Sequence, residues 1–207
     1  AKNITEVLAK AFKAVDSKRK KRSDDLKIKE KLENLMPAIE NGFIYAIMFQ
    51  DQRIEDMDHY RRLLGLYGDW GCMLALAVGD DHPGSSVPNT VDAGVRMQMN
   101  YARVREILKG TWNCVVGAVI SNKIPVFLPM DQAKMGYEER IGMIEVCREL
   151  VQKLKQMTDI RFRIGIGSAR KLNQSMDSYE EALKALANST GSVAHADDLP
   201  IQCRYDK

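Results

Sequence analysis

The feature that most constrains the fold of this 207-residue chain is a change of hydrophobic periodicity near residue 70. Before it, apolar residues recur every three or four positions, which predicts helices. After it, apolar runs of strand length alternate with helical patterns, in the order strand–helix–strand–strand–helix–strand–helix–strand. With 45% hydrophobic residues, the chain can bury a sheet against helices. We therefore expect an α+β fold that follows a helical arm.

The boundaries of the expected elements follow from turn and capping residues. Strands are expected at 72–79, 112–120, 124–130, 160–167 and 192–199, and helices at 91–108, 137–157 and 177–187. Gly110 is expected to stop the first of these helices, and Asp177 to cap the last, with Glu180 three positions on. The first six elements are typical of the ferredoxin-like fold, an antiparallel sheet with two helices on one face. A boundary near Gly65 separates a coupling arm, residues 1–64, from an α/β domain, residues 65–207.

The arm contains an apolar seam bordered by charged residues. Its second half consists of Ile28, Leu32, Leu35 and Ile39, at spacings of four, three and four. So narrow a seam needs a partner helix, and we expect a homodimer joined along it. Pro37 lies within the seam and is expected to kink or restart the helix. Residues 16–25 hold no apolar side chain and are expected to be solvated, with a nucleic acid or acidic partner as the alternative.

Charge and cysteine content exclude several classes of protein. Residues 1–36 hold eleven Lys or Arg against six Asp or Glu, too weak a bias to predict nucleic-acid binding by this chain. The four cysteines are far apart and form no C-x-x-C motif, so we expect reduced thiols in a cytoplasmic protein. No run of 18 apolar residues occurs, and we expect no membrane partner.

Two glycines and two arginines in the strand 160–167 raise separate questions. Gly165 and Gly167 do not form a G-x-G-x-x-G motif, because residue 170 is Arg. We expect them to let a helix approach the strand closely, with a phosphate-binding loop as the alternative. Arg161 and Arg163 alternate and should share one face. That face is expected to be exposed to solvent, or otherwise to bind an anionic ligand or a neighbouring domain.

The element order, with the "IGIG" strand leading into "SYEEALKAL", resembles the GGDEF (diguanylate cyclase) branch of the nucleotide-cyclase superfamily. The resemblance implies carboxylates that hold a divalent metal against a nucleoside triphosphate. One would come from the end of the first strand, where this chain has Asp80 and Asp81. Others would come from the hairpin turn, which here reads Ser121-Asn122-Lys123. We therefore expect no catalytic residue, no metal site and no cofactor. An active cyclase is a remote alternative.

A narrower resemblance involves the arm as well. The segments "NLMPAIENGFIYAIMFQ" and "IEDMDHYRRLLGL", ahead of a degenerate GGDEF-like domain, are similar to the central region of AraC-type two-component response regulators. This implies a receiver domain that is phosphorylated and helix-turn-helix domains that bind DNA, both elsewhere in a longer chain. The expected function is non-catalytic signal relay in a bacterial transcriptional regulator. The alternative is a sensor of a small, nucleotide-like molecule, with Asp80, Asp81 and His82 as the possible ligand loop.

Overall fold

The computed structural model describes residues 2–49, 54–79 and 90–198. The chain forms two compact units, Ala1–Ala38 and Ile39–Lys207. The division lies within helix α1 (Lys2–Phe49), one residue after Pro37. Residues 39–49 fold with the sheet because Phe43, Ile44 and Ile47 are fully buried. The expected domain boundary near Gly65 therefore falls inside the second unit. Whether residues 1–64 and 65–207 act as separate functional domains stays a prediction.

The first unit is helical at every described residue. Three seam residues, Ile28, Leu32 and Leu35, are 48–61% exposed, whereas Ile39, in the second unit, is only partly exposed. Pro37 lies inside α1, which does not restart there, and the expected kink stays a prediction. Among the described residues, no helix is both long and apolar enough to cross a membrane.

The second unit contains a mixed sheet with helices. After α1 come α2 (Ile54–Leu64), β1 (Trp70–Val78), α3 (Thr90–Thr111), β2 (Val115–Val116), β3 (Lys123–Met130), α4 (Tyr137–Thr158), β4 (Phe162–Ile166), β5 (Arg170–Lys171), a 3₁₀ turn (Leu172–Gln174), α5 (Ser175–Asn188), β6 (Val193–His195) and a second 3₁₀ turn (Ala196–Asp198). The strand order is β2-β3-β1-β4-β6, and β5 pairs with β1. All pairs are antiparallel except β4 with β6. This confirms the α+β fold, and strands β1 to β4 have the order of the ferredoxin-like fold.

The hairpin between β2 and β3 closes in a tight turn. Ser121 and Asn122 have φ angles of 47° and 61°, so both adopt the left-handed conformation that a two-residue hairpin turn requires. Ile120 pairs with Lys123 through backbone hydrogen bonds of 2.8 and 2.9 Å. The expected hairpin is confirmed, although β2 is only two residues long.

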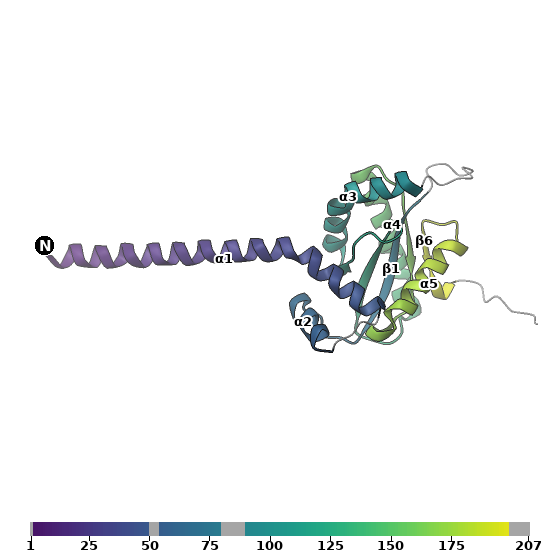
Figure 1. Cartoon of the computed structure of the whole chain (residues 1–207), viewed down its shortest axis with the longest axis horizontal. Coiled ribbons are helices and arrows are strands. Elements are labelled where there is room, and N and C mark those ends of the chain that lie inside the picture. The colour runs from purple at the N-terminus through teal and green to yellow at the C-terminus, as the bar shows by residue number, and fades with distance from the viewer. Residues whose placement is uncertain (1, 50–53, 80–89, 199–207) are drawn as a thin grey trace, which may run out of the picture. The chain divides into compact units, whose positions relative to one another are not determined.

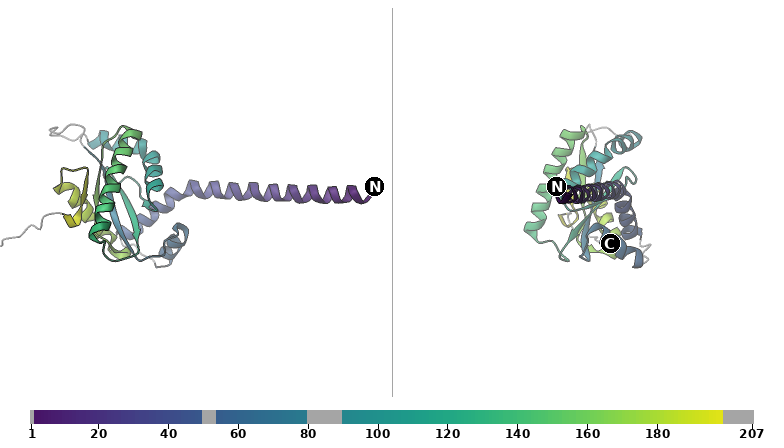
Figure 2. Two further views of the ribbon diagram at one scale, coloured as in Figure 1. Left: turned by 180° about the vertical axis from the view of Figure 1, so that it is seen from behind. Right: turned by 90° about the vertical axis from the view of Figure 1, so that its left-hand side faces the viewer.

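Both faces of the sheet are covered. On one face, α3 and α4 pack against residues such as Cys72, Leu74 and Val126. On the other, α5 and residues 43–48 of α1 cover Met73, Ala75 and other residues. Figure 1 shows α3 and α5 on opposite sides of β1, and Figure 2 shows the same layers from two further directions. The two helices on one face were expected. The second layer makes the sheet a buried, two-sided one, so Arg163 does not lie on an open solvent face.

Two expected helix ends are wrong. Helix α3 continues through Gly110 to Thr111, where the hydroxyl donates to the carbonyl of Ile107 at 2.9 Å. Helix α5 begins at Ser175, so Asp177 lies in its first turn and is not the cap. The preceding 3₁₀ turn leads directly into the helix, and Ser175 Oγ donates to the carbonyl of Leu172 at 2.8 Å. An acid in the first turn still stabilises the helix dipole.

Candidate functional site

The predicted ligand loop, Asp80, Asp81 and His82, lies outside the described residues. Within the described part of the chain, no group of three or more His, Cys, Asp or Glu side chains could hold a metal ion. The hairpin turn lies beside α3, because a β-carbon on Gly94 would come within 2.4 Å of Asn122 Oδ1. The turn therefore carries the amide of Asn122, whereas the resemblance to the GGDEF branch implies carboxylates there.

The two glycines of the "IGIG" strand let α5 lie directly on the sheet. A β-carbon on Gly165 would lie 2.1 Å from the carbonyl oxygen of Ala182. One on Gly167 would lie 1.9 Å from the carbonyl oxygen of Ser178. Neither distance is possible for a real side chain, so only glycine fits at both positions. This confirms close packing of helix on strand. In the described structure the two glycines contact α5.

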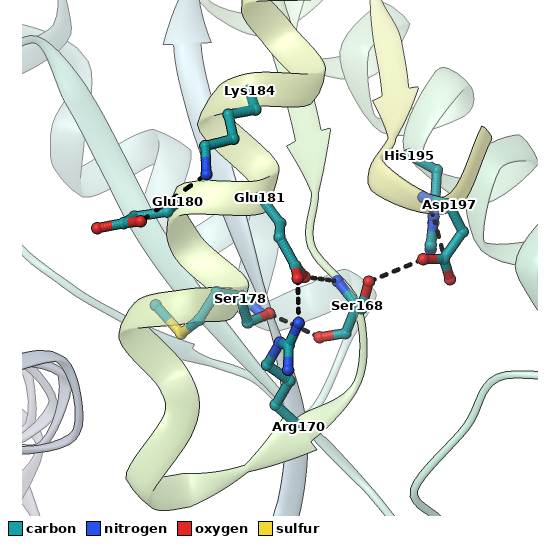
Figure 3. A network of polar contacts seen from close by, with 9 residues as sticks. Ser168, Arg170, Ser178, Glu180, Glu181, Lys184, His195 and Asp197 are labelled. Atoms are coloured by element: carbon teal, nitrogen blue, oxygen red, sulfur yellow. Dashed lines mark hydrogen bonds and ion pairs between the residues drawn. The ribbon is translucent and has the colours of Figure 1, made fainter. Parts of the chain in front are cut away.

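A polar network joins the loop after β4 to α5 and β6 (Figure 3). Ser178 Oγ accepts from the N–H of Met73 at 2.9 Å and donates to the carbonyl of Ser168 at 2.8 Å. Glu181 accepts from the N–H of Ser168 at 3.0 Å and from the guanidinium of Arg170. These contacts hold the loop on α5, and each links residues at least ten positions apart.

The ionisable groups of this network have shifted pKa values. Burial alone would raise the pKa of Glu181, but the hydrogen bonds from Arg170 and Ser168 outweigh it and the pKa is lowered. Burial lowers the pKa of His195, more than the nearby carboxylates of Asp197 and Asp198 raise it. His195 Nδ1 accepts from the N–H of Asp197 at 3.0 Å, so the neutral ring carries its proton on Nε2. That nitrogen is buried and has no partner among the described residues.

A second polar site lies where the last turns of α1 meet the edge of the sheet. Glu40 is fully buried, and its carboxylate accepts from Lys109 Nζ at 2.6 Å and pairs with Arg105 Nη2 at 3.1 Å, both on α3. Its other oxygen accepts from the N–H of Val116 in β2 at 3.2 Å. One side chain therefore joins three elements, α1, α3 and β2.

The neighbouring residue extends this contact along the edge of the sheet. Asn41 Oδ1 accepts from the N–H of Ala118 at 3.0 Å, two residues beyond Val116. Tyr101 of α3 donates its hydroxyl to the carbonyl of Gly117 at 2.8 Å. Glu40 and Asn41 thus bind the N–H groups of Val116 and Ala118, which a further strand would otherwise pair. We call Glu40, Asn41 and their partners the α1–edge junction.

Comparison with protein families agrees with this fold. The sequence profile of the GGDEF-like domain matches residues 51–187, well over half of the chain. The chain belongs to the GGDEF-like domain family. The family is related in fold to the nucleotide cyclases, which supports the resemblance drawn from the sequence. No curated protein matches the chain. The match includes strands β1 to β5 but ends before β6, and it begins after α1, so the α1–edge junction joins the family domain to a helix outside the matched range.

Sequence reasoning missed the α1–edge junction, although it left a signal. Glu40 lies three and four positions before the buried Phe43 and Ile44, so a charge interrupts an apolar stripe. A charge on a buried stripe needs a charged or hydrogen-bonding partner. The sequence does not indicate which cation supplies it, because Arg105 and Lys109 lie more than 60 positions away.

The described cysteines are buried and form no disulfide. Burial raises the pKa of Cys72 and Cys147 to about 12 and that of Cys114 to about 11. Thiols with pKa values this high are almost entirely protonated and are poor nucleophiles, because the thiolate is the reactive form. The three therefore act as small core residues, and Cys203 lies outside the described residues.

Proposed function

We propose that this chain is a non-catalytic, dimeric signal-relay segment of a bacterial DNA-binding response regulator. The observation that carries the proposal is the make-up of helix α1. The same helix bears the exposed apolar seam of Ile28, Leu32 and Leu35 and, five residues after Leu35, the buried Glu40. A helix with these two features can pass a change in seam pairing to the GGDEF-like domain.

The proposed mechanism is mechanical. A receiver domain ahead of the arm would change how two copies of the seam pair, and α1 would transmit the change to β2 and α3. Glu40 and Asn41 suit this role, because their side chains accept hydrogen bonds from the N–H groups of Val116 and Ala118 at the edge of the sheet. Regulation of this kind requires two arrangements of the arm that differ in affinity for the partners.

Loss of catalysis is the second part of the proposal. A cyclase must neutralise a triphosphate with metal-bound carboxylates. In this chain the hairpin turn offers Ser121, Asn122 and Lys123, and between Asp92 and Asp131 the only carboxylate is Glu106, in α3. We expect no turnover of GTP or ATP by the purified chain with Mg²⁺ or Mn²⁺. Product formation that is lost on Asp80→Asn would overturn this part of the proposal.

The dimerisation part is tested by light scattering coupled to size exclusion. The wild-type chain is expected to form a dimer, and Leu32→Asp plus Leu35→Asp a monomer, because a charge in an apolar seam must be desolvated when the helices pair. The control with the same change of charge is Lys27→Asp, at an exposed position off the seam. It should stay dimeric. A wild-type monomer at high concentration, or equal dissociation of both variants, would remove the support for the relay.

A further inference from the structure

A pocket of about 550 Å³ lies at the end of the sheet where β1 finishes and β4 begins. It is bounded by α4, by β4 and by the loop between α5 and β6. Its lining residues are Gly79, Val151, Lys155, Arg161, Phe162, Arg163, Ser189, Thr190 and Ser192. Three of these are cations, three carry hydroxyl groups, and none is acidic. Among its described walls, the pocket therefore combines positive charge with hydrogen-bond donors.

The walls of the pocket are fixed by backbone contacts. Arg163 donates to the carbonyls of Leu186 at 2.9 Å and Gly191 at 3.1 Å, and also to that of Ser189. The N–H of Gly79 donates to the carbonyl of Arg161 at 2.7 Å, and that of Ile164 to the carbonyl of Ser192 at 2.8 Å. The α5–β6 loop is thus tied to β4 at several points, so the pocket is formed before any ligand enters.

Two of the three cations are left without a protein partner. Neither the ammonium of Lys155 nor the guanidinium of Arg161 makes a hydrogen bond or ion pair with the described residues, and both residues are exposed. Arg163 is held by carbonyl groups alone, so no described carboxylate balances its charge. A guanidinium and an ammonium beside hydroxyl groups suit a compact oxyanion, and Val151 adds an apolar wall.

We propose that this pocket binds a small phosphate-bearing molecule, with Lys155 and Arg161 as its charged contacts. Ser189, Thr190 and Ser192 supply further donors, and the partly exposed Val151 contacts an apolar group attached to the phosphate. The site is separate from the hairpin turn and from the α1–edge junction. It therefore rests neither on the relay role nor on the proposed loss of catalysis.

The test is isothermal titration of the full chain, without divalent metal, with inorganic phosphate, guanosine monophosphate and adenosine monophosphate. We expect saturable binding with a dissociation constant of about 1 mM or tighter. Lys155→Gln plus Arg161→Gln should weaken it about tenfold or more, because two charge-assisted hydrogen bonds are lost. The matched control is Arg148→Gln plus Lys153→Gln, which removes the same charge from exposed residues of α4 outside the pocket. It should bind as the wild type does.

The probes also distinguish the sources of the phosphate. Equal affinity for phosphate and nucleotides means that the pocket holds the phosphate group alone. Tighter binding of one nucleotide means that the apolar wall contacts its base, and either result supports the site. All substituted residues are exposed, and thermal melts will show whether the variants are folded. Absence of saturable binding by every probe, or equal weakening in the pocket and control variants, would overturn the proposal.

Discussion

Removing the carboxylate of Glu40 should destabilise the second unit strongly. The group is fully buried and accepts from Lys109, Arg105 and the N–H of Val116. Breaking a buried ion pair at one partner costs about 3–5 kcal/mol. The side chains of Arg105 and Lys109 are 20% and 32% exposed, so water partly solvates them once the acid is gone. We therefore expect about 3 kcal/mol for Glu40→Ala, at the lower end of that range.

The assay is thermal and urea unfolding of the full chain. A loss of about 3 kcal/mol corresponds to a fall in Tm of about 6–12 °C for a domain of this size. The matched control is Glu33→Ala, whose carboxylate is exposed and lies 4.0 Å from Lys29, and it should change stability by less than about 0.5 kcal/mol. A double-mutant cycle with Lys109→Met should give a coupling of about 0.5–3 kcal/mol. If Glu40→Ala unfolds like the control, the junction does not stabilise the fold and our reasoning fails.

Two other predictions concern the far side of the sheet. Gly167→Ala should destabilise the protein by about 1–3 kcal/mol or more, because the new methyl group would overlap the carbonyl of Ser178. The measurement is the midpoint of urea unfolding, with Gly142→Ala, where the methyl group meets no other atom, as the control. Equal midpoints for the two variants would refute the close packing. Stability should fall as the pH drops below about 6.5, because the unfolded chain protonates His195 near its ordinary pKa of 6.5 whereas the folded chain, with a lowered pKa, resists protonation. His195→Gln should flatten this slope in urea unfolding at a series of pH values, and an unchanged slope would show that His195 does not cause it.

The sequence was most informative where one physical effect dominates. Buried central strands read as continuous apolar runs, so residues 72–79 and 124–130 predicted β1 and β3 closely. The hairpin turn followed from the short polar segment Ser121-Asn122-Lys123 between such runs. Gly165, in β4, and Gly167, just after it, also pointed to the correct packing, because a strand rarely uses glycine unless another backbone comes close.

Long-range partners were hidden from the sequence. The guanidinium of Arg163 binds carbonyls at positions 186–191, and an arginine gives no sign of whether it will meet water or backbone oxygens. The covering of the second sheet face also escaped prediction, because the apolar stripes of α1 and α5 fit many neighbours equally well. Helix ends were wrong where a neighbouring 3₁₀ turn, and not the capping residue, set the start of α5.

The way Glu40 and Asn41 cover β2 has a practical consequence for dissecting the molecule. The family match begins at residue 51, and a fragment cut there would lack both side chains. The amides of Val116 and Ala118 would then lose their acceptors, and the core would lose the buried Phe43, Ile44 and Ile47. Strand edges with unpaired backbone groups can pair with those of other copies, so such a fragment would tend to aggregate during purification. Expression boundaries for this domain belong upstream of Ile39.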